Sequence, residues 1–536
     1  MRRAHGVVAV LALSLLLPSA ACDGKGAGSG AAGDAQVAAA PDSLDPICAD
    51  STIDQLCPVV PHEVVVRVPN GYTGFVSATQ AKFDVYSWQT FVALNWPAAG
   101  TSGVVPQFSD DTSPRVWETY LDAAEVYSAP GNRHPCSVPP GQKFLGSMAK
   151  NGDVVDPDGD YDEAVGGPLM DANLNFAVYE KKINGEEATY LRSHLLNTPR
   201  GQFAADTADT ALVFPAGRTK GTEGAIEVKA AWRVLQSNDD STRYFRRHGV
   251  IYVPPRNSAN GDSLCLNVTV GLVGMHIVHK TDQFLGDWIW STFEQEDNAP
   301  LCADSTSPAS CGASQPRWSF YNAACTTCVR NDSLHLAGTG DSTFLWNPTP
   351  PYAARYAVQG KYGNQITRVQ VPKGETDTVN ATWHARVKGT VWEHYHLIGS
   401  QWMSGERSLV AVPDTLRNTV LESYIPTTSS CLGCHQYAQT LADTTNGNKS
   451  VFADFSFLLG MAQQRTGEDM LADVGRQKSM PRSANVPFRH PTLQIFGNPG
   501  NRAATQSATP RQTPGAGRPS APNASVTPAA GARKKP

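Results

Sequence analysis

The chain has 536 residues, of which 41% are hydrophobic and 17% charged, and its formal net charge is −5. This length and apolar content allow one large hydrophobic core or two. The slightly acidic balance gives no reason to expect nucleic acid as a partner, so the function has to be read from local motifs.

The first 22 residues have the features of a signal peptide. A basic start precedes an apolar run at 7–17, which is too short to span a membrane, and small residues lie just before Cys22. Cys22 resembles a bacterial lipoprotein cleavage site, so lipid anchoring and plain release are the two alternatives. Residues 23–45 predict a flexible linker. We expect an exported protein of the periplasm or cell envelope, with a lipid on Cys22 as its one membrane contact.

The chain has eleven cysteines. Setting aside Cys22 and the pair at 431 and 434 leaves eight, an even number that favours disulfides in an exported protein. These eight are Cys48, Cys57, Cys136, Cys265, Cys302, Cys311, Cys325 and Cys328. The last four would form two pairs that close short loops, with metal binding as the alternative. The other pairings stay open.

Residues 46–415 predict a large β-rich region with some helices. Apolar side chains at helical spacing over 83–96, followed by a proline, predict an amphipathic helix. Alternating or β-branched runs at 226–232, 249–253 and 264–273 predict strands. The Gly-, Pro- and Asp-rich residues 131–168 predict irregular surface.

Two further runs, 272–281 and 288–295, predict paired strands that form an aromatic wall. His276 and His279 would point to opposite faces of the first strand, so only one of them could face inward. Glu294 shares a face with the tryptophans of the second strand. Such a wall could line a haem or a substrate pocket, and ordinary sheet packing is the alternative.

A third aromatic run, 390–402, also predicts a strand. It would place Trp392, His394 and His396 on one face. The two histidines are candidates for contacting a haem propionate or the distal side of a haem. A strand with solvated histidines fits the pattern equally well.

The segment Cys431-Leu432-Gly433-Cys434-His435 matches a c-type haem attachment site. On a helix both thiols and the imidazole share one face, so the two sulfurs can bond to one porphyrin while His435 binds its iron. Residues 427–430 offer N-caps for that helix. The alternatives are a redox dithiol, which would want a βαβ context, and half a zinc site, which would need a second ligand pair. We expect one covalent haem c with its iron.

Residues beyond the motif complete the predicted haem region, 416–497. A helix over 451–462 would place Phe452, Phe455 and Leu459 on one stripe, suited to packing against a porphyrin edge. Residues 498–536 are rich in Pro and Ala, with basic and no acidic side chains, and predict a disordered tail. With the β-rich region before it, a small, mostly helical haem region gives an α+β fold.

Four segments, YSWQTFVALNWP, GMHIVHKT, WIWSTFEQEDN and SSCLGCHQYA, together resemble a family of exported bacterial cytochrome c proteins. The resemblance covers most of the mature chain and implies a haem protein with no established substrate. Residues 416–496 alone are similar to small cytochrome c domains. The chain departs from those domains because a much longer region precedes the motif, and that region is expected to complete the haem pocket.

In small cytochromes c a methionine well downstream of the motif commonly supplies the second axial ligand. The resemblance therefore makes Met480, followed by a proline, the first candidate for the iron's sixth position. Other candidates are Met461, Met470, His490 and His276, and an open position is also compatible with the sequence.

Two classes of function follow. The first is an electron carrier with one covalent haem and a redox partner protein. The second is a haem c-dependent redox enzyme, peroxidase- or oxygenase-like, with an open distal site lined by His276, His279 or Glu294. The chain has a single CxxCH motif, whereas dihaem peroxidases need two. No catalytic residue is predicted.

Overall fold

The computed structural model describes part of the unit formed by residues 41–536. The described residues are 56–62, 64, 79–99, 107–110, 112–127, 136–146, 168–208, 211–218, 222–282, 288–302, 311, 317–325, 327–332, 345–354, 363–368, 374–405, 408–424, 429–443, 447 and 449–464. The predicted signal peptide, the linker, Met480 and the basic tail lie outside these ranges.

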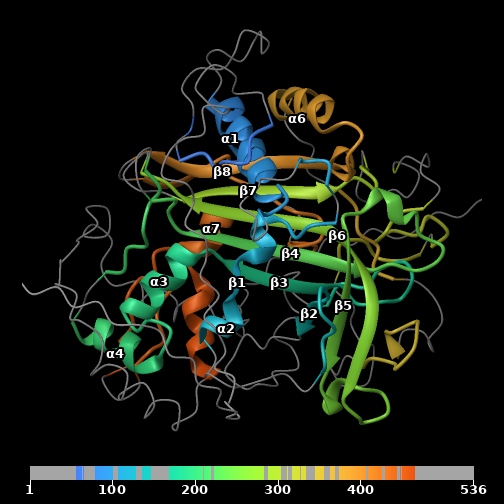
Figure 1. Ribbon diagram of the computed structural model, residues 1–536, viewed down its shortest axis with the longest axis horizontal. Helices are drawn as coiled ribbons and strands as arrows, with labels where there is room; N and C mark the ends of the chain where they lie inside the picture. Colours follow the sequence, from blue (N-terminus) through green and yellow to red (C-terminus); the bar gives the residue numbers. More distant parts are fainter. Residues whose placement is uncertain are drawn as a thin grey trace, which may run out of the picture. The chain divides into compact units, whose positions relative to one another are not determined.

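The fold is built on a nine-stranded sheet with the order β1-β3-β4-β6-β7-β8-β9, in which β5 also pairs with β6 and β2 with β5 (Figure 1). Every pairing is antiparallel except that of β2 with β5. The strands are β1 (Leu121–Asp122), β2 (Lys143–Gly146), β3 (Val178–Ile183), β4 (Ile226–Val234), β5 (Arg246–Val253), β6 (Leu264–Lys280), β7 (Trp288–Gln295), β8 (Tyr395–Gly405) and β9 (Ser408–Val412). With its helices this sheet confirms the predicted α+β class.

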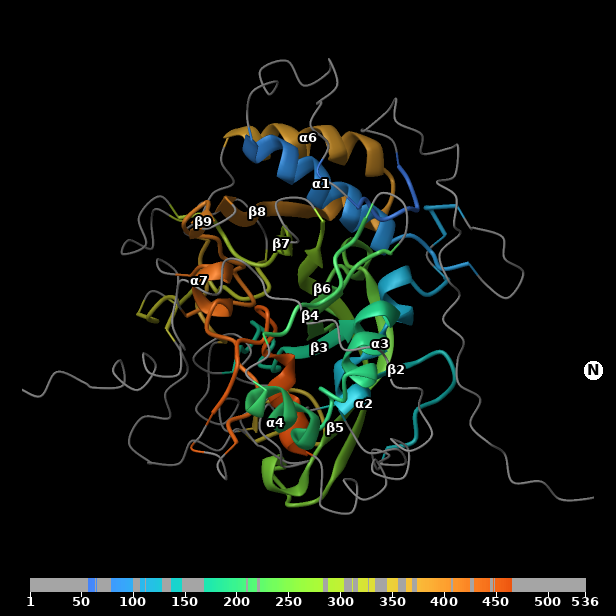
Figure 2. The same cartoon turned by 90° about the vertical axis from the view of Figure 1, so that its left-hand side faces the viewer.

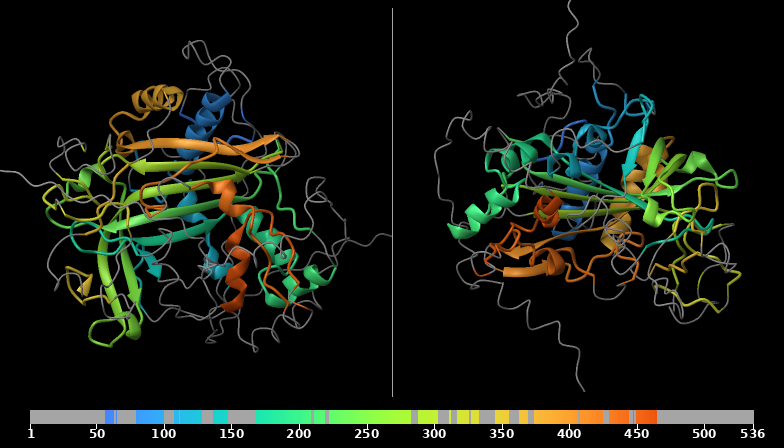
Figure 3. Two further views of the ribbon diagram at one scale, coloured as in Figure 1. Left: turned by 180° about the vertical axis from the view of Figure 1, so that it is seen from behind. Right: turned by 90° about the horizontal axis from the view of Figure 1, so that it is seen from below.

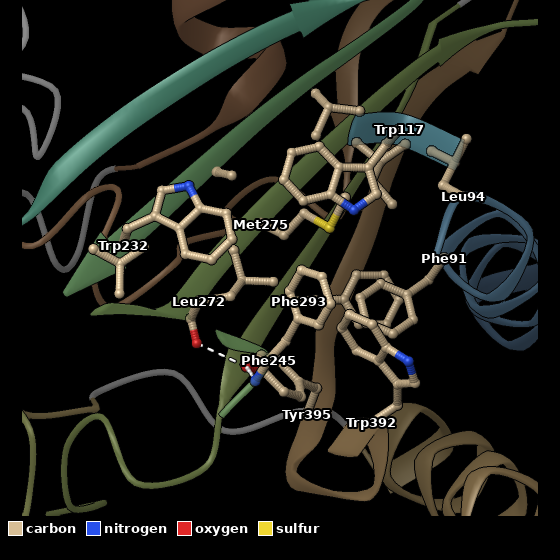
Figure 4. Packing of buried hydrophobic residues seen from close by; sticks show 14 of the residues in the cluster. Phe91, Leu94, Trp117, Trp232, Phe245, Leu272, Met275, Phe293, Trp392 and Tyr395 are labelled. Atoms are coloured by element: carbon tan, nitrogen blue, oxygen red, sulfur yellow. Dashed lines mark hydrogen bonds between the residues drawn. The ribbon is translucent and has the colours of Figure 1, made fainter. Parts of the chain in front are cut away.

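One face of the sheet, called here the α1 face, packs against α1 (Thr79–Leu94), which in turn packs against α6 (Gly374–Val387) (Figure 2). The predicted helix over 83–96 is thus confirmed. Its apolar side chains enter a large aromatic core, where the ring of Phe91 lies 4.1 Å from that of Phe293 (Figure 4). Burial of this apolar surface is the main driving force for the fold.

The opposite face, called here the motif face, carries a second hydrophobic cluster. Leu432 and Phe455 from the predicted haem region pack there with Val278 and Trp290 of the sheet. Side chains of α2 (Ala123–Tyr127), α3 (Gly185–Ser193), α4 (Pro199–Thr207) and α7 (Cys431–His435) contribute to this cluster. The 3₁₀ helix η10 (Phe457–Gln464) packs against α2. The left panel of Figure 3 shows α7, in orange, in front of the strands. The predicted haem region therefore shares a core with the β-rich region.

Further 3₁₀ helices are η2 (Val116–Thr119), η4 (Ser241–Arg243), η5 (Pro255–Asn257) and η8 (Val391–His394). η8 corrects the predicted strand over 390–402. The strand begins only at Tyr395, because Trp392 turns into the aromatic core, and His394 therefore does not share a strand face with His396.

Two other predictions differ from the structure. The helix predicted over 451–462 is confined to η10, because Asp454 and Phe455 adopt left-handed backbone angles (φ +48° and +69°) that interrupt a right-handed helix. The stretch 131–168, predicted to be irregular, contains β2, whose buried Leu145 joins the core. The two runs at 264–273 and 272–281 form the single long strand β6.

The disulfides Cys302–Cys311 and Cys325–Cys328 confirm the two short-loop pairings. A third disulfide, Cys136–Cys265, joins residues 129 positions apart. Of the helices in the described ranges, none is both long and apolar enough to cross a membrane.

Candidate haem-attachment site

The motif forms the short helix α7, which lies beside β8 and β9. Ser430 is the N-cap, and its hydroxyl accepts a hydrogen bond from the Gly433 amide (3.1 Å), as the sequence predicted for this stretch. The side chain of Gln401 on β8 accepts a second one from the Leu432 amide (2.8 Å). Leu432 is fully buried below the helix. Capping and burial together seat the motif on the sheet.

The loop before α7 lies directly on the motif face. A Cβ at Gly274 would come within 2.4 Å of Val420, so β6 needs a glycine there for the loop to approach. Asn418 donates to the Thr292 hydroxyl (2.9 Å), and the Thr419 amide donates to Glu294. These contacts hold the loop that leads into the motif.

Cys431 and Cys434 are free thiols, and Cys434 is exposed. Each of the other seven cysteines in the described ranges is disulfide-bonded. Burial raises the pKa of Cys431 well above its usual range and also raises that of Cys434. A redox-active dithiol needs a lowered thiol pKa, so these thiols do not have the environment of one.

The His435 ring is fixed by one hydrogen bond. Its Nδ1 lies 2.6 Å from the carbonyl oxygen of Phe455. A carbonyl only accepts, so Nδ1 must carry the proton and Nε2 keeps its lone pair. Burial lowers the pKa of His435 to about 4, so the ring is neutral at neutral pH. This is the state in which an imidazole binds a metal.

A turn at Asp454 and Phe455 directs the Phe455 carbonyl toward His435. Asp454 and Phe455 are both left-handed, which is strained for a bulky side chain. The turn is held by the Asp454 carboxylate, which forms a buried ion pair with Lys280 and accepts from the Phe214 amide (2.7 Å). Its backbone oxygen accepts from the Trp288 indole (2.8 Å). A set of tertiary bonds therefore maintains the His435 contact.

A charged row of the sheet lies near the motif. His276 on β6 pairs in register with Lys229 on β4, and its Nε2 is 3.4 Å from the Glu422 carboxylate. Although burial opposes ionisation of Glu422, its interactions with His276 and Lys229 keep its pKa below the usual value. The same two side chains also help to lower the pKa of His435, which places them within electrostatic range of that ring.

The paired strands β6 and β7 form the predicted aromatic wall on the motif face. The Trp290 ring lies 6.1 Å from that of His435, and the ring of Phe457, which is 46% exposed, lies 5.1 Å away on η10. Phe455 and Leu459 are also buried in this cluster, although not on a helical stripe. The structure thus brings Cys431, Cys434 and His435 together with the wall.

The other histidine candidates lie elsewhere. His279 faces the α1 face, where its two ring nitrogens contact the Tyr86 hydroxyl (2.5 Å) and the Glu223 carbonyl (2.7 Å). His394 contacts Glu296 (2.9 Å). His396 pairs in register with Glu294, near the C-terminal end of β7. Trp290, which contacts the His435 ring, lies toward the other end of that strand.

Glu294 and Met461 are also accounted for by the fold. Glu294 is buried, accepts from the Thr419 amide and pairs with Arg368 (3.0 Å), so it is a structural carboxylate. Met461 is buried in the second cluster. Met470, Met480 and His490 are outside the described ranges.

Two buried donors at this face were not singled out from the sequence. The Trp290 Nε1 atom and the Arg417 Nη1 atom have no hydrogen-bond partner in the described part of the chain. Arg417 is only 4% exposed, and burial lowers its pKa to about 10. A buried donor without a partner is costly, so these atoms suit a ligand that carries acceptor oxygens.

Over the described residues, no group of three or more His, Cys, Asp or Glu side chains could hold a metal ion. A zinc site built on Cys431 and Cys434 therefore finds no further ligands there. A haem iron takes at most two ligands from the protein, so this finding does not bear on haem.

No protein-family model matches the chain, and searches of curated proteins and of solved structures find no significant match.

Proposed function

We propose that this protein is an exported c-type cytochrome that binds one covalent haem through Cys431 and Cys434 and carries electrons to or from a redox partner protein. The observation that supports it most is the His435 ring: Nδ1 donates to the Phe455 carbonyl at 2.6 Å, which leaves Nε2 for an iron. It lies beside two free thiols in a chain whose other described cysteines are disulfide-bonded.

The residues present fit a haem. Such a group would supply a one-electron iron couple. Its ring would cover the exposed aromatic side of Phe457 next to His435, and its propionates would give acceptors to the unpartnered donors of Trp290 and Arg417. Thioether bonds to Cys431 and Cys434 would hold it permanently, which suits a protein outside the cytoplasm.

We further propose that residues 416–497 form a cytochrome c-like haem region whose second wall is the motif face of the sheet. Met480 stays our proposed sixth ligand. The envelope location, the signal peptide and a lipid on Cys22 are part of the same proposal. Replacement Cys22→Ala should release the protein from the membrane fraction if the lipid is present.

The decisive experiment is haem staining of the denatured protein after expression with haem-attachment machinery. The wild type should stain, and Cys431→Ala with Cys434→Ala should not. The matched control is Cys325→Ala with Cys328→Ala, which removes a pair of identical spacing that lacks a following histidine and should keep the stain. Staining that survives in the first double variant contradicts the proposal.

A second candidate, a redox enzyme with an open iron, is favoured by one observation. His276 and Glu422 form a pair at 3.4 Å near the motif, and such a pair could move a proton to or from a bound substrate. Carbon monoxide added to the reduced protein separates the two functions. A low-spin haem without a response indicates a closed carrier, whose sixth ligand Met480→Ala would open. A high-spin haem that binds carbon monoxide in the wild type favours the enzyme.

A further inference from the structure

Two carboxyl side chains face each other in the second hydrophobic cluster, beneath the turn that carries Phe455. Glu187 on α3 is fully buried, and its carboxyl lies within hydrogen-bond reach of that of Glu227 on β4. Neither oxygen of Glu187 receives a hydrogen from any donor in the described residues, and Oε1 of Glu227 is likewise buried without a partner. Two ionised carboxylates can only accept, so a bond between them requires a shared proton.

The surroundings favour holding that proton. The buried Tyr127 hydroxyl of α2 is near both carboxyls and has no partner in the described part of the chain. Asp454 adds a negative charge, although Lys280 pairs with it. Ile183 and Val278, the strand neighbours of Glu227, are apolar. Burial is the main cause that raises the pKa of Glu227 to about 7 and that of Glu187 well above its usual range.

The pair is connected to the proximal histidine. The Ser456 side chain is hydrogen-bonded to Glu227, and Ser456 directly follows Phe455, whose carbonyl accepts from His435. Glu227 also lies on the motif face, two residues along β4 from Lys229. A change of charge at His435 should therefore change the proton affinity of the carboxyl pair, because one short turn separates them and the interior between them is poorly solvated, so screening is weak.

We infer that Glu187 and Glu227 form a proton-binding site coupled to the oxidation state of the haem. If a redox partner gave one electron to an iron held at His435, the pair would take up one proton from solvent. If that electron then passed to an acceptor protein, the proton would return to solvent. The inference rests on the proposed function, since it needs an iron at His435.

The test is the reduction potential of the holoprotein as a function of pH. In the wild type it should fall as pH rises through neutrality, because the reduced form binds the proton more tightly. Glu187→Gln keeps the side-chain shape and can donate to Glu227, so it should flatten this dependence, as should Glu227→Gln. Glu186→Gln, on the same helix, is the matched control and should keep it. A slope retained in both Gln variants overturns the inference.

A second measurement does not need haem. Infrared spectra of the haem-free protein should show the carbonyl stretch of a buried protonated carboxyl at neutral pH, and the band should vanish in Glu187→Gln or, if that variant does not fold, in Glu227→Gln. Absence of the band in the wild type overturns the inference. Absence of covalent haem with the band present contradicts the proposed function instead, so the two failures are distinguishable.

Discussion

A buried histidine lies on each face of the sheet, and the two differ in how many of their ring nitrogens are hydrogen-bonded. His279 points to the α1 face, where contacts at both ring nitrogens occupy its whole hydrogen-bonding capacity. His435 lies on the motif face, where Nδ1 is bonded and Nε2 is kept for another atom. Burial lowers the pKa of both rings to about 4. Burial alone therefore does not distinguish these two histidines, whereas the number of hydrogen-bonded ring nitrogens does.

The largest expected effect is a loss of stability on the α1 face. Trp88 on α1 is fully buried, stacks on Trp383 with ring centroids 5.8 Å apart, and donates to Asn380 (2.8 Å). Trp88→Ala should lower the free energy of unfolding by about 4 kcal/mol, because it leaves a cavity in the aromatic core and removes one of the two hydrogen bonds that the Asn380 oxygen accepts. Denaturant unfolding measures this loss. Folded protein should still stain for haem, and loss of staining in folded Trp88→Ala would mean that the faces are not independent.

The next prediction compares two lysines that form ion pairs and lie near tryptophan rings. Lys280 pairs with Asp454 on the motif face, and Lys143 pairs with Glu118 and Glu180 on the α1 face. Lys280→Met should cost about 3 kcal/mol, since it removes the cation that pairs with the buried Asp454 carboxylate. It also removes a positive charge next to the turn that carries Phe455, so the haem potential should shift to a more negative value.

Lys143→Met is the matched control for that experiment. It should lower the free energy of unfolding without moving the potential, and Lys280→Arg should restore the potential. Equal shifts in the potential of both Met variants would show that the effect comes from general destabilisation.

The third prediction concerns acid. Because the pKa of His279 is about 4 in the folded chain and about 6.5 when unfolded, the unfolded chain binds one more proton between these pH values. The free energy of unfolding should therefore fall by up to about 3 kcal/mol as pH drops from 6.5 to 4. His279→Gln should reduce this slope in denaturant titrations. His248→Gln, at an exposed position, should leave it unchanged.

The smallest expected effect concerns Gln401, whose hydrogen bond holds α7 against β8. Gln401 accepts from the Leu432 amide and donates to the Pro413 carbonyl (2.7 Å). Gln401→Ala should cost about 2 kcal/mol for these two hydrogen bonds and lower the yield of covalent haem, as measured by staining per folded protein. Gln436→Ala, which removes a local bond within the motif region, should have a smaller effect on that yield. The reverse order would contradict the role of Gln401.

Several features were predictable because they depend on residues close together in the chain. The helix over 79–94, the strand pair β6 and β7, the Ser430 cap and the two short disulfides follow from local spacing, and so does the opposite orientation of His276 and His279. Each is set by backbone periodicity or by a loop of a few residues. The short helix at Cys431–His435 belongs to the same class.

Tertiary structure decided the rest. The Phe455 carbonyl is 20 residues from His435, and Lys280 is 174 from Asp454, so neither pairing has a signal in local sequence. The failed helix over 451–462 has the same cause, because tertiary bonds of Asp454 outweigh the helical pattern. Glu187 and Glu227 lie on separate elements and meet only because the fold brings their carboxyls together. Sequence spacing thus determined that Cys431, Cys434 and His435 share one short helix, and long-range packing decided which of their polar atoms are hydrogen-bonded, since hydrogen-bond partners come from neighbours that only the fold supplies.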